Sequence, residues 1–203
     1  LGFLPVEATA RAKVLNDLDM HATGGFFPVL LHDETHDPLP VVAEELKSYT
    51  ASGATTLVLA ADSGKAGYDE KRSELTPDQW QTVFKNLNAI SALADSVGVK
   101  AVLHPHVGTI IETHEDVMHV VQGSNIAFCL DTGHMVIGGA DPVWFSAEHA
   151  KRVAHSHLKD VDLSWATQVQ AGSVTYYDAV VKGMYRPLGT GDVNIAAIVR
   201  NLL

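Results

Sequence analysis

Three short stretches of the chain concentrate the side chains that could do chemistry. They read His104-Pro-His106, Asp131-Thr-Gly-His134 and His155-Ser-His157-Leu-Lys159-Asp160. Imidazole nitrogens and carboxylate oxygens bind divalent metal ions, and imidazole also carries protons near neutral pH. These residue types therefore predict a metal site with proton-transfer groups beside it, if the fold brings the three stretches together.

Each stretch coincides with a short segment that reads as a buried strand. The clearest is Ile126-Ala-Phe-Cys-Leu, which runs directly into Asp131. Uninterrupted apolar runs of this length are typical of parallel strands, whose carboxyl ends share one edge of the sheet. Asp131 taken alone would fit a helix or turn cap equally well. Because three strands end in the same way, we expect their ends to converge on one site; the strands lie within Lys100–His106, Asn125–Asp131 and Val153–Leu158.

The whole chain alternates helical and apolar segments, as a parallel α/β fold does. Helix, glycine and short strand recur at Gly53, Gly98 and Gly123, without a hairpin signal between strands. This spacing predicts a (β/α)8 TIM barrel, which needs roughly 250 residues when complete. An open doubly wound sheet is the alternative, although no strand is followed by Gly-x-Gly-x-x-Gly.

The other segments are assigned from periodicity and capping residues. We expect strands within Met20–Leu31 and at Thr55–Ala61, and helices at Val6–Leu18, Val41–Ser52, Thr76–Gly98, Thr113–Gln122, Asp141–His149, Tyr176–Lys182 and Ile195–Leu203. The loops are His32–Pro40, Asp62–Leu75 and Val161–Gly172, with a turn at Pro187–Asp192. The chain opens on Leu1 and closes on an amphipathic helix. We therefore expect residues 1–203 to form one TIM-barrel domain that is incomplete at both ends.

Two of these loops carry a second interpretation. The loop His32–Pro40 holds two histidines and three acids, a composition that permits a metal site but is more typical of a solvated loop. The loop Asp62–Leu75 is long enough to act as a lid or a substrate loop.

Composition narrows the class of protein. The 203 residues are 46% hydrophobic and 19% charged, as in soluble globular proteins. Acidic residues outnumber basic ones by 24 to 14, and the net charge of −10 opposes binding to nucleic acid. The chain lacks a run of roughly 18 apolar residues and a charged-then-apolar leader. The single cysteine, Cys129, fits a core residue in a reducing compartment, so we expect a cytoplasmic protein with no membrane partner.

Four motifs in order resemble the xylose isomerase-like barrel enzymes, a group of sugar isomerases and epimerases. Within that group they are most similar to the inosose dehydratases. The motifs are His104-Pro-His-Val-Gly-Thr109, Asp131-Thr-Gly-His134 with Gly139-Ala-Asp-Pro142, His157-Leu-Lys-Asp160, and Pro187-Leu-Gly-Thr-Gly191.

This resemblance implies a divalent metal, typically Mn²⁺ or Co²⁺, with Zn²⁺ or Mg²⁺ as alternatives. By position its ligands would be His104, Asp131 and His157. Many relatives have glutamate where this chain has His104. The fourth ligand of the family, an acid on the final strand, has no counterpart in the sequence.

The resemblance also implies a reaction, the dehydration of 2-keto-myo-inositol or a close keto-polyol in inositol catabolism. A base removes the proton beside the carbonyl, and the enolate that forms needs positive charge or donors at its oxygen. His106 or His134 could act as the base or as the acid for the departing hydroxyl. Lys159 could polarise an oxygen or pair with Asp160. For His134 the alternative is a turn residue that holds Asp131, and His155 is assigned to the core.

Other functions remain open on the same residues. A keto-sugar isomerase or epimerase, of the hydroxypyruvate isomerase or ketose 3-epimerase type, would begin with the same proton removal. A non-catalytic barrel that binds a metal or a polyol is less consistent with so many ionisable groups, and the charge balance opposes a DNA-repair endonuclease. The expected partner is a small keto-polyol or keto-sugar, and homo-oligomerisation is left open.

Overall fold

A five-stranded parallel sheet forms the centre of the protein. The computed structural model describes residues 3–70 and 74–203. Its strand order, β1-β2-β3-β4-β5, follows the order of the chain without a reversal. A doubly wound sheet reverses its order at a switch point, so the topology is that of a barrel wall, and the α/β barrel-type prediction is confirmed. The strands are β1 (Gly24–Leu30), β2 (Thr56–Asp62), β3 (Lys100–Leu103), β4 (Ala127–Asp131) and β5 (Val153–His157).

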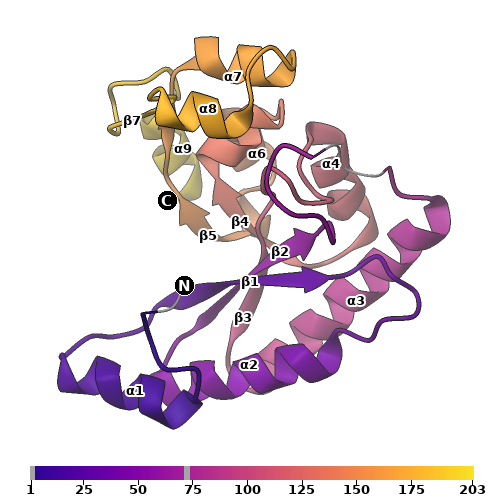
Figure 1. Ribbon diagram of the computed structural model, residues 1–203, viewed down its shortest axis with the longest axis vertical. Coiled ribbons are helices and arrows are strands. Elements are labelled where there is room, and N and C mark those ends of the chain that lie inside the picture. Colours follow the sequence, from indigo (N-terminus) through magenta and orange to yellow (C-terminus); the bar gives the residue numbers. More distant parts are fainter. Residues whose placement is uncertain (1–2, 71–73) are drawn as a thin grey trace.

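Helices follow the strands along the chain. Figure 1 shows α1, α2 and α3 along one side of the molecule, and α7 and α8 at its opposite end, beyond β4 and β5. The helices are α1 (Ala8–Asp17), α2 (Leu39–Ser52), α3 (Pro77–Ser96), α4 (His114–Gly123), α5 (Thr132–Ile137), α6 (Pro142–Glu148), α7 (Leu163–Gln170), α8 (Tyr176–Val181) and α9 (Ile195–Leu202), with a 3-10 turn at Ala150–Arg152.

Capping residues set the ends of the predicted helices. Thr76 and Gln79 form the expected capping box at the start of α3, and Thr113 forms one with Asp116 at the start of α4. Gly53 ends α2 in the left-handed region, at φ 71°, where glycine carries no steric cost. The predicted helices before residue 160 are present, with ends shifted by a few residues.

The two faces of the sheet have different roles. One face packs against helices in a large core, whose fully buried side chains include Leu57, Leu59, Leu103, Phe128 and Leu130. The other face carries a small separate cluster of Val58, Val102 and Cys129, one residue from each of three neighbouring strands. Side chains alternate along a strand, so the face that carries Val102 and Cys129 also receives the polar residues that follow them. The predicted core role of Cys129 is confirmed.

Two short helices lie between residues 132 and 172 where no helix is expected from the sequence. Thr132–Ile137 forms helix α5, whose first backbone amides are capped by Asp131. Most of the predicted loop Val161–Gly172 is helix α7, capped by Asp162. A two-residue antiparallel ladder pairs β6 (Asp160–Val161), which directly precedes α7, with β7 (Tyr185–Arg186), which follows α8. Loop-like composition hid short helices whose stability comes from capping and from tertiary packing.

Asp160 organises the turn Pro187–Asp192, which is present as predicted. Its carboxylate is fully buried and accepts four backbone N–H groups, from Val161, Gly189, Gly191 and Val193, at 2.8–3.0 Å. A Cβ at Gly191 would lie 2.4 Å from Asp160 Oδ1, so the turn can close only around glycine. Burial raises the pKa of Asp160, but the hydrogen bonds to its charged form outweigh burial and hold the pKa below its usual range.

Among the helices formed by residues 3–70 and 74–203, none combines the length and apolar character needed to cross a bilayer.

We expect Asp160→Asn to destabilise the protein by about 2 to 3 kcal/mol, because an amide N–H would face backbone donors and the charge-assisted bonds would be lost. Urea unfolding measures the change. The matched control is Asp192→Asn in the same turn, where an exposed carboxylate accepts one backbone N–H, from Leu163. Its cost should stay below about 1 kcal/mol; equal losses for the two variants would contradict the structural role of Asp160.

The stabilisation by Asp160 should depend on pH in one direction. Because its pKa is lowered in the folded state, its contribution is complete above the unfolded value of about 3.9 and disappears as pH falls through the folded value. The difference in unfolding free energy between the wild type and Asp160→Asn should therefore be constant between about pH 5 and 7 and shrink below about pH 4. A difference that grows in acid would show that another group is responsible.

Candidate metal and proton-transfer site

The carboxylate of Asp131, at the carboxyl end of β4, is the centre of the candidate site. Its side chain is fully buried, and its two oxygens have separate partners. Oδ1 accepts the backbone N–H groups of Gly133 at 3.1 Å and His134 at 3.0 Å, which begins helix α5. Asp131 therefore caps helix α5 through Oδ1, which leaves its Oδ2 to take part in the candidate site.

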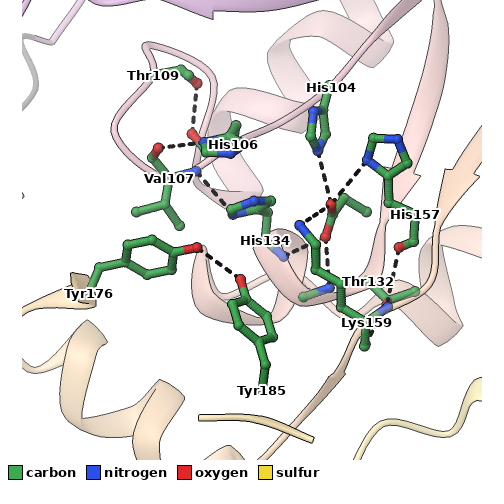
Figure 2. Close-up of polar contacts among 12 residues, drawn as sticks. His104, His106, Val107, Thr109, Thr132, His134, His157, Lys159, Tyr176 and Tyr185 are labelled. Carbon is green, nitrogen blue, oxygen red and sulfur yellow. Dashed lines mark hydrogen bonds and ion pairs between the residues drawn. The ribbon is translucent and has the colours of Figure 1, made fainter. Parts of the chain in front are cut away.

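Three side chains meet at the second oxygen, Asp131 Oδ2. His104 Nε2 lies 3.1 Å from it, His157 Nδ1 3.3 Å and Lys159 Nζ 2.6 Å. Figure 2 shows the three side chains pointing toward this one carboxylate. They come from the ends of β3 and β5 on either side of β4, so the predicted convergence of strand ends occurs.

A shift in strand register brings His157 beside Asp131. The pairing of β4 with β5 moves by one residue after Phe128, so that Cys129 pairs with His155 and Asp131 with His157. Without this shift, Asp131 would pair with Ser156 and the histidines would point to the other face. The irregularity is therefore required for the cluster.

The surroundings keep Asp131 ionised. Burial alone would raise its pKa, but hydrogen bonds with His104 and His157, together with the positive charge of Lys159, hold the pKa well below its usual range. A buried carboxylate in this state presents a full negative charge to any cation that reaches it.

These side chains fit a divalent ion. With metal–ligand bonds of about 2.0–2.2 Å, neighbouring donor atoms lie roughly 3 to 3.5 Å apart, close to the separations at Asp131 Oδ2. Two sets of donors lie within 4.8 Å of one another: His104 with Asp131 and His134, and His104 with Cys129 and His157. In addition, His104 Nδ1 is buried without a hydrogen-bond partner among the described residues, so the protein leaves one imidazole donor atom unused.

His106 and His134 form a second pair beside the carboxylate, with ring centroids 3.6 Å apart. The backbone of Val107 assigns their protons. His106 Nδ1 lies 2.7 Å from Val107 O, which can only accept, so this nitrogen carries the proton and Nε2 is an acceptor. The Val107 N–H donates to His134 Nδ1 at 3.4 Å, so in the neutral ring Nε2 of His134 carries the proton. One ring thus presents an acceptor and the other a donor.

Burial keeps both rings neutral. It lowers the pKa of His106 to about 4 and that of His134 to about 2, in spite of the opposing charge of Asp131. A neutral imidazole can accept a proton at one nitrogen and donate a hydrogen bond from the other.

One alternative for Lys159 and the assignment of His155 do not hold. Of the two roles left open for Lys159, pairing with Asp160 does not occur, because backbone amides use that carboxylate; Lys159 pairs with Asp131 instead. His155 is not a core residue: it is partly exposed on β5, which lies at the end of the described sheet, and its ring is 5.2 Å from that of His157. The predicted site residues His104, His106, Asp131, His134, His157 and Lys159 all lie in the cluster, and their roles stay predictions.

Sequence reasoning missed the aromatic side chains around the cluster. Tyr176 and Tyr185 share a hydrogen bond of 3.0 Å between their hydroxyl groups, as Figure 2 shows. Lys159 Nζ lies 5.6 Å from the ring centre of Tyr185, and Phe26 of β1 contacts His104 and His106. These residues carry no local pattern that could have revealed them.

The loop His32–Pro40 lies elsewhere. With helix α3 it lines a cleft of about 700 Å³, and its residues Glu34–Asp37 are exposed, as expected for a solvated loop. Within the described part of the chain, no compact group of three metal donors includes this loop.

Comparisons with known proteins agree with this architecture. The rhizopine catabolism protein MocC of Rhizobium meliloti is 29% identical over 210 residues, covering 99% of this chain and 64% of its own length. An inosose dehydratase of Geobacillus thermodenitrificans is 29% identical over 211 residues, covering 98% of this chain and 70% of its own. The chain thus spans about two thirds of the length of these relatives.

The solved structures give the same fold. The IolI protein, crystallised with a bound zinc atom, has a TM-score of 0.68 at 14% identity, covering 97% of this chain and 68% of its own. A family model described as "Xylose isomerase-like TIM barrel" matches residues 41–203. With its unreversed parallel sheet and its polar strand ends gathered at one edge, the chain belongs to the xylose isomerase-like TIM barrel family.

Proposed function

We propose that the protein is a metal-dependent dehydratase that removes water from a cyclic keto-polyol such as 2-keto-myo-inositol. The observation that carries this proposal is the meeting of His104, His157 and Lys159 at one oxygen of a buried, ionised Asp131, beside a neutral imidazole pair. The similarity to an inosose dehydratase supports the choice of substrate. Residues 1–203 as one domain, and homo-oligomerisation, stay predictions.

In this proposal His104, Asp131 and His157 hold a divalent ion, which when bound supplies positive charge to polarise the ketone. Two of these donors are imidazoles, and a third imidazole, His134, lies close by. Imidazole suits Zn²⁺ and Co²⁺, whereas Mg²⁺ and Mn²⁺ prefer oxygen ligands. The zinc atom in the IolI structure agrees with this preference.

The chain's own side chains would move the protons. The acceptor nitrogen of His106, Nε2, removes the proton on the carbon beside the carbonyl, and an enolate forms. The N–H of His134 Nε2 donates a hydrogen bond to the hydroxyl on the next carbon, and the proton taken up by His106 is delivered to that hydroxyl, which leaves as water, so that both rings end neutral. Lys159 keeps Asp131 ionised and places an ammonium group where negative charge develops on the substrate oxygen.

The principal test is turnover. We expect the purified protein, supplied with a divalent ion, to convert 2-keto-myo-inositol to an enone, followed by ultraviolet absorbance. Asp131→Asn and His106→Gln should each reduce kcat by at least about 100-fold, because they remove charge stabilisation and the proton acceptor. His119→Ala is the matched histidine control and should leave kcat unchanged, because His119 is exposed on α4 and its ring stacks on Trp80 of α3.

The same assay separates the competing functions. Interconversion of ketohexoses without enone formation would replace the dehydratase by an isomerase or epimerase, which begins with the same proton removal. Metal or polyol binding with no turnover of either kind would indicate a non-catalytic binding barrel. Full enone formation by Asp131→Asn would remove the proposed site.

The affinity for metal ions can be measured without turnover, and it should depend on the proposed ligands. By calorimetric titration, Zn²⁺ and Co²⁺ should bind more tightly than Mg²⁺, and Asp131→Asn and His157→Ala should weaken Zn²⁺ binding by more than about tenfold, since the first removes the charge of one ligand and the second removes an imidazole ligand. His119→Ala again serves as the control. Unchanged Zn²⁺ affinity in both variants, with circular dichroism showing a retained fold, would place the ion elsewhere.

A further inference from the structure

The loop after β2 is attached to a helix that lies far away in the chain. Asp69 in this loop accepts the backbone N–H of Tyr176 at 2.6 Å through Oδ1 and that of Tyr177 at 3.4 Å through Oδ2. The first of these contacts spans 107 residues of sequence. Because both amides belong to the first turn of α8, the carboxylate fixes the loop against the start of this helix.

The attachment places Tyr68, the neighbour of Asp69, beside the imidazole pair. The Tyr68 ring centre lies 5.6 Å from that of His106 and 5.6 Å from that of Tyr176. A Cβ at Gly108 would lie 2.8 Å from Tyr68 Cα, and Gly108 has a φ of +81°. Glycine at this position therefore allows the loop to approach the segment that carries His106.

Four rings form a continuous aromatic wall, which we define as Tyr68, His106, His134 and Tyr176. The centroids of His134 and Tyr176 are 6.0 Å apart, and those of His106 and His134 are 3.6 Å apart. Tyr176 and His134 are buried, whereas Tyr68 is 52% exposed. The wall thus ends in one large ring that keeps open surface next to the proton-transfer pair.

We propose that Tyr68 is a specificity-determining residue against which the carbon face of a cyclic polyol lies, and that Asp69 is a positioning residue that holds it there. This inference rests on the proposed function. A cyclic polyol presents several C–H groups on one face, and these bury apolar area on an aromatic ring while its hydroxyl groups face polar partners. An open-chain polyol of the same size must first lose chain entropy to present such a face.

The test uses binding and turnover together. The variants are Tyr68→Ala, Tyr68→Phe and Asp69→Ala. The control is Tyr177→Ala, which removes a 65% exposed ring from α8, the helix that Asp69 contacts. Calorimetry measures the affinity for myo-inositol and for D-sorbitol, a cyclic and an open-chain probe. The enone assay gives KM and kcat for 2-keto-myo-inositol.

We expect Tyr68→Ala to weaken myo-inositol binding and raise KM by about tenfold, with kcat changed less than about twofold, because the ring contributes to binding and not to proton transfer. The preference for myo-inositol over D-sorbitol should fall with it. Tyr68→Phe and Tyr177→Ala should resemble the wild type. Asp69→Ala should raise KM in the same direction and speed amide hydrogen exchange at the start of α8.

The outcomes separate this inference from the proposed function. If the wild type binds myo-inositol in a Tyr68-dependent way but forms no enone, the dehydratase proposal fails and the role of Tyr68 stands. If Tyr68→Ala turns over the ketone with unchanged KM and binds myo-inositol with unchanged affinity, the inference is overturned. A wild type that binds no cyclic polyol also overturns it.

Discussion

One buried negative charge determines much of this structure. A carboxylate without solvent contact is costly unless both oxygens have partners. Asp131 obtains them from four directions: the first amides of α5 at Oδ1, and His104, His157 and Lys159 at Oδ2. The end of β3, the end of β5 and the beginning of α5 are therefore tied to one group. A change at any of these partners would leave charge uncompensated, which is why the cluster is both a structural junction and a candidate site.

Side chains alternate between the two faces of the sheet, so one face packs in the core and the other carries the polar cluster. Residues such as Leu103, Phe128 and Leu130 enter the large core under the helices, while Val102 and Cys129 face the other way. The next residues on that second face are His104 and Asp131. Strand β5 would break the pattern, but the one-residue shift in its pairing restores it and sets His157 opposite Asp131. The site thus depends on a local irregularity in an otherwise regular ladder.

This dependence explains what the sequence could and could not predict. The strands before His104 and Asp131 and the barrel topology follow from short apolar runs separated by capped helices, because these signals are local. Spacing left the adjacent Asp160 open as a partner of Lys159, but backbone amides from a turn nearly thirty residues later occupy that carboxylate, and Lys159 pairs with Asp131. Helix α7 was missed because its stability comes from the Asp162 cap and from packing. Tyr68 and Tyr176 meet only through tertiary contacts, which no local pattern encodes.

Residue types alone also do not predict which ring of the imidazole pair presents an acceptor nitrogen and which presents a donor. A single residue, Val107, supplies both assignments: its carbonyl accepts from His106 and its N–H donates to His134. The acceptor nitrogen of one ring and the donor nitrogen of the other are therefore set by backbone geometry. Val107 itself is buried in a small hydrophobic cluster, and proline at this position would remove the N–H and leave the proton on His134 undetermined. The donor and acceptor sides of the pair are in this sense a consequence of the fold rather than of the residue types.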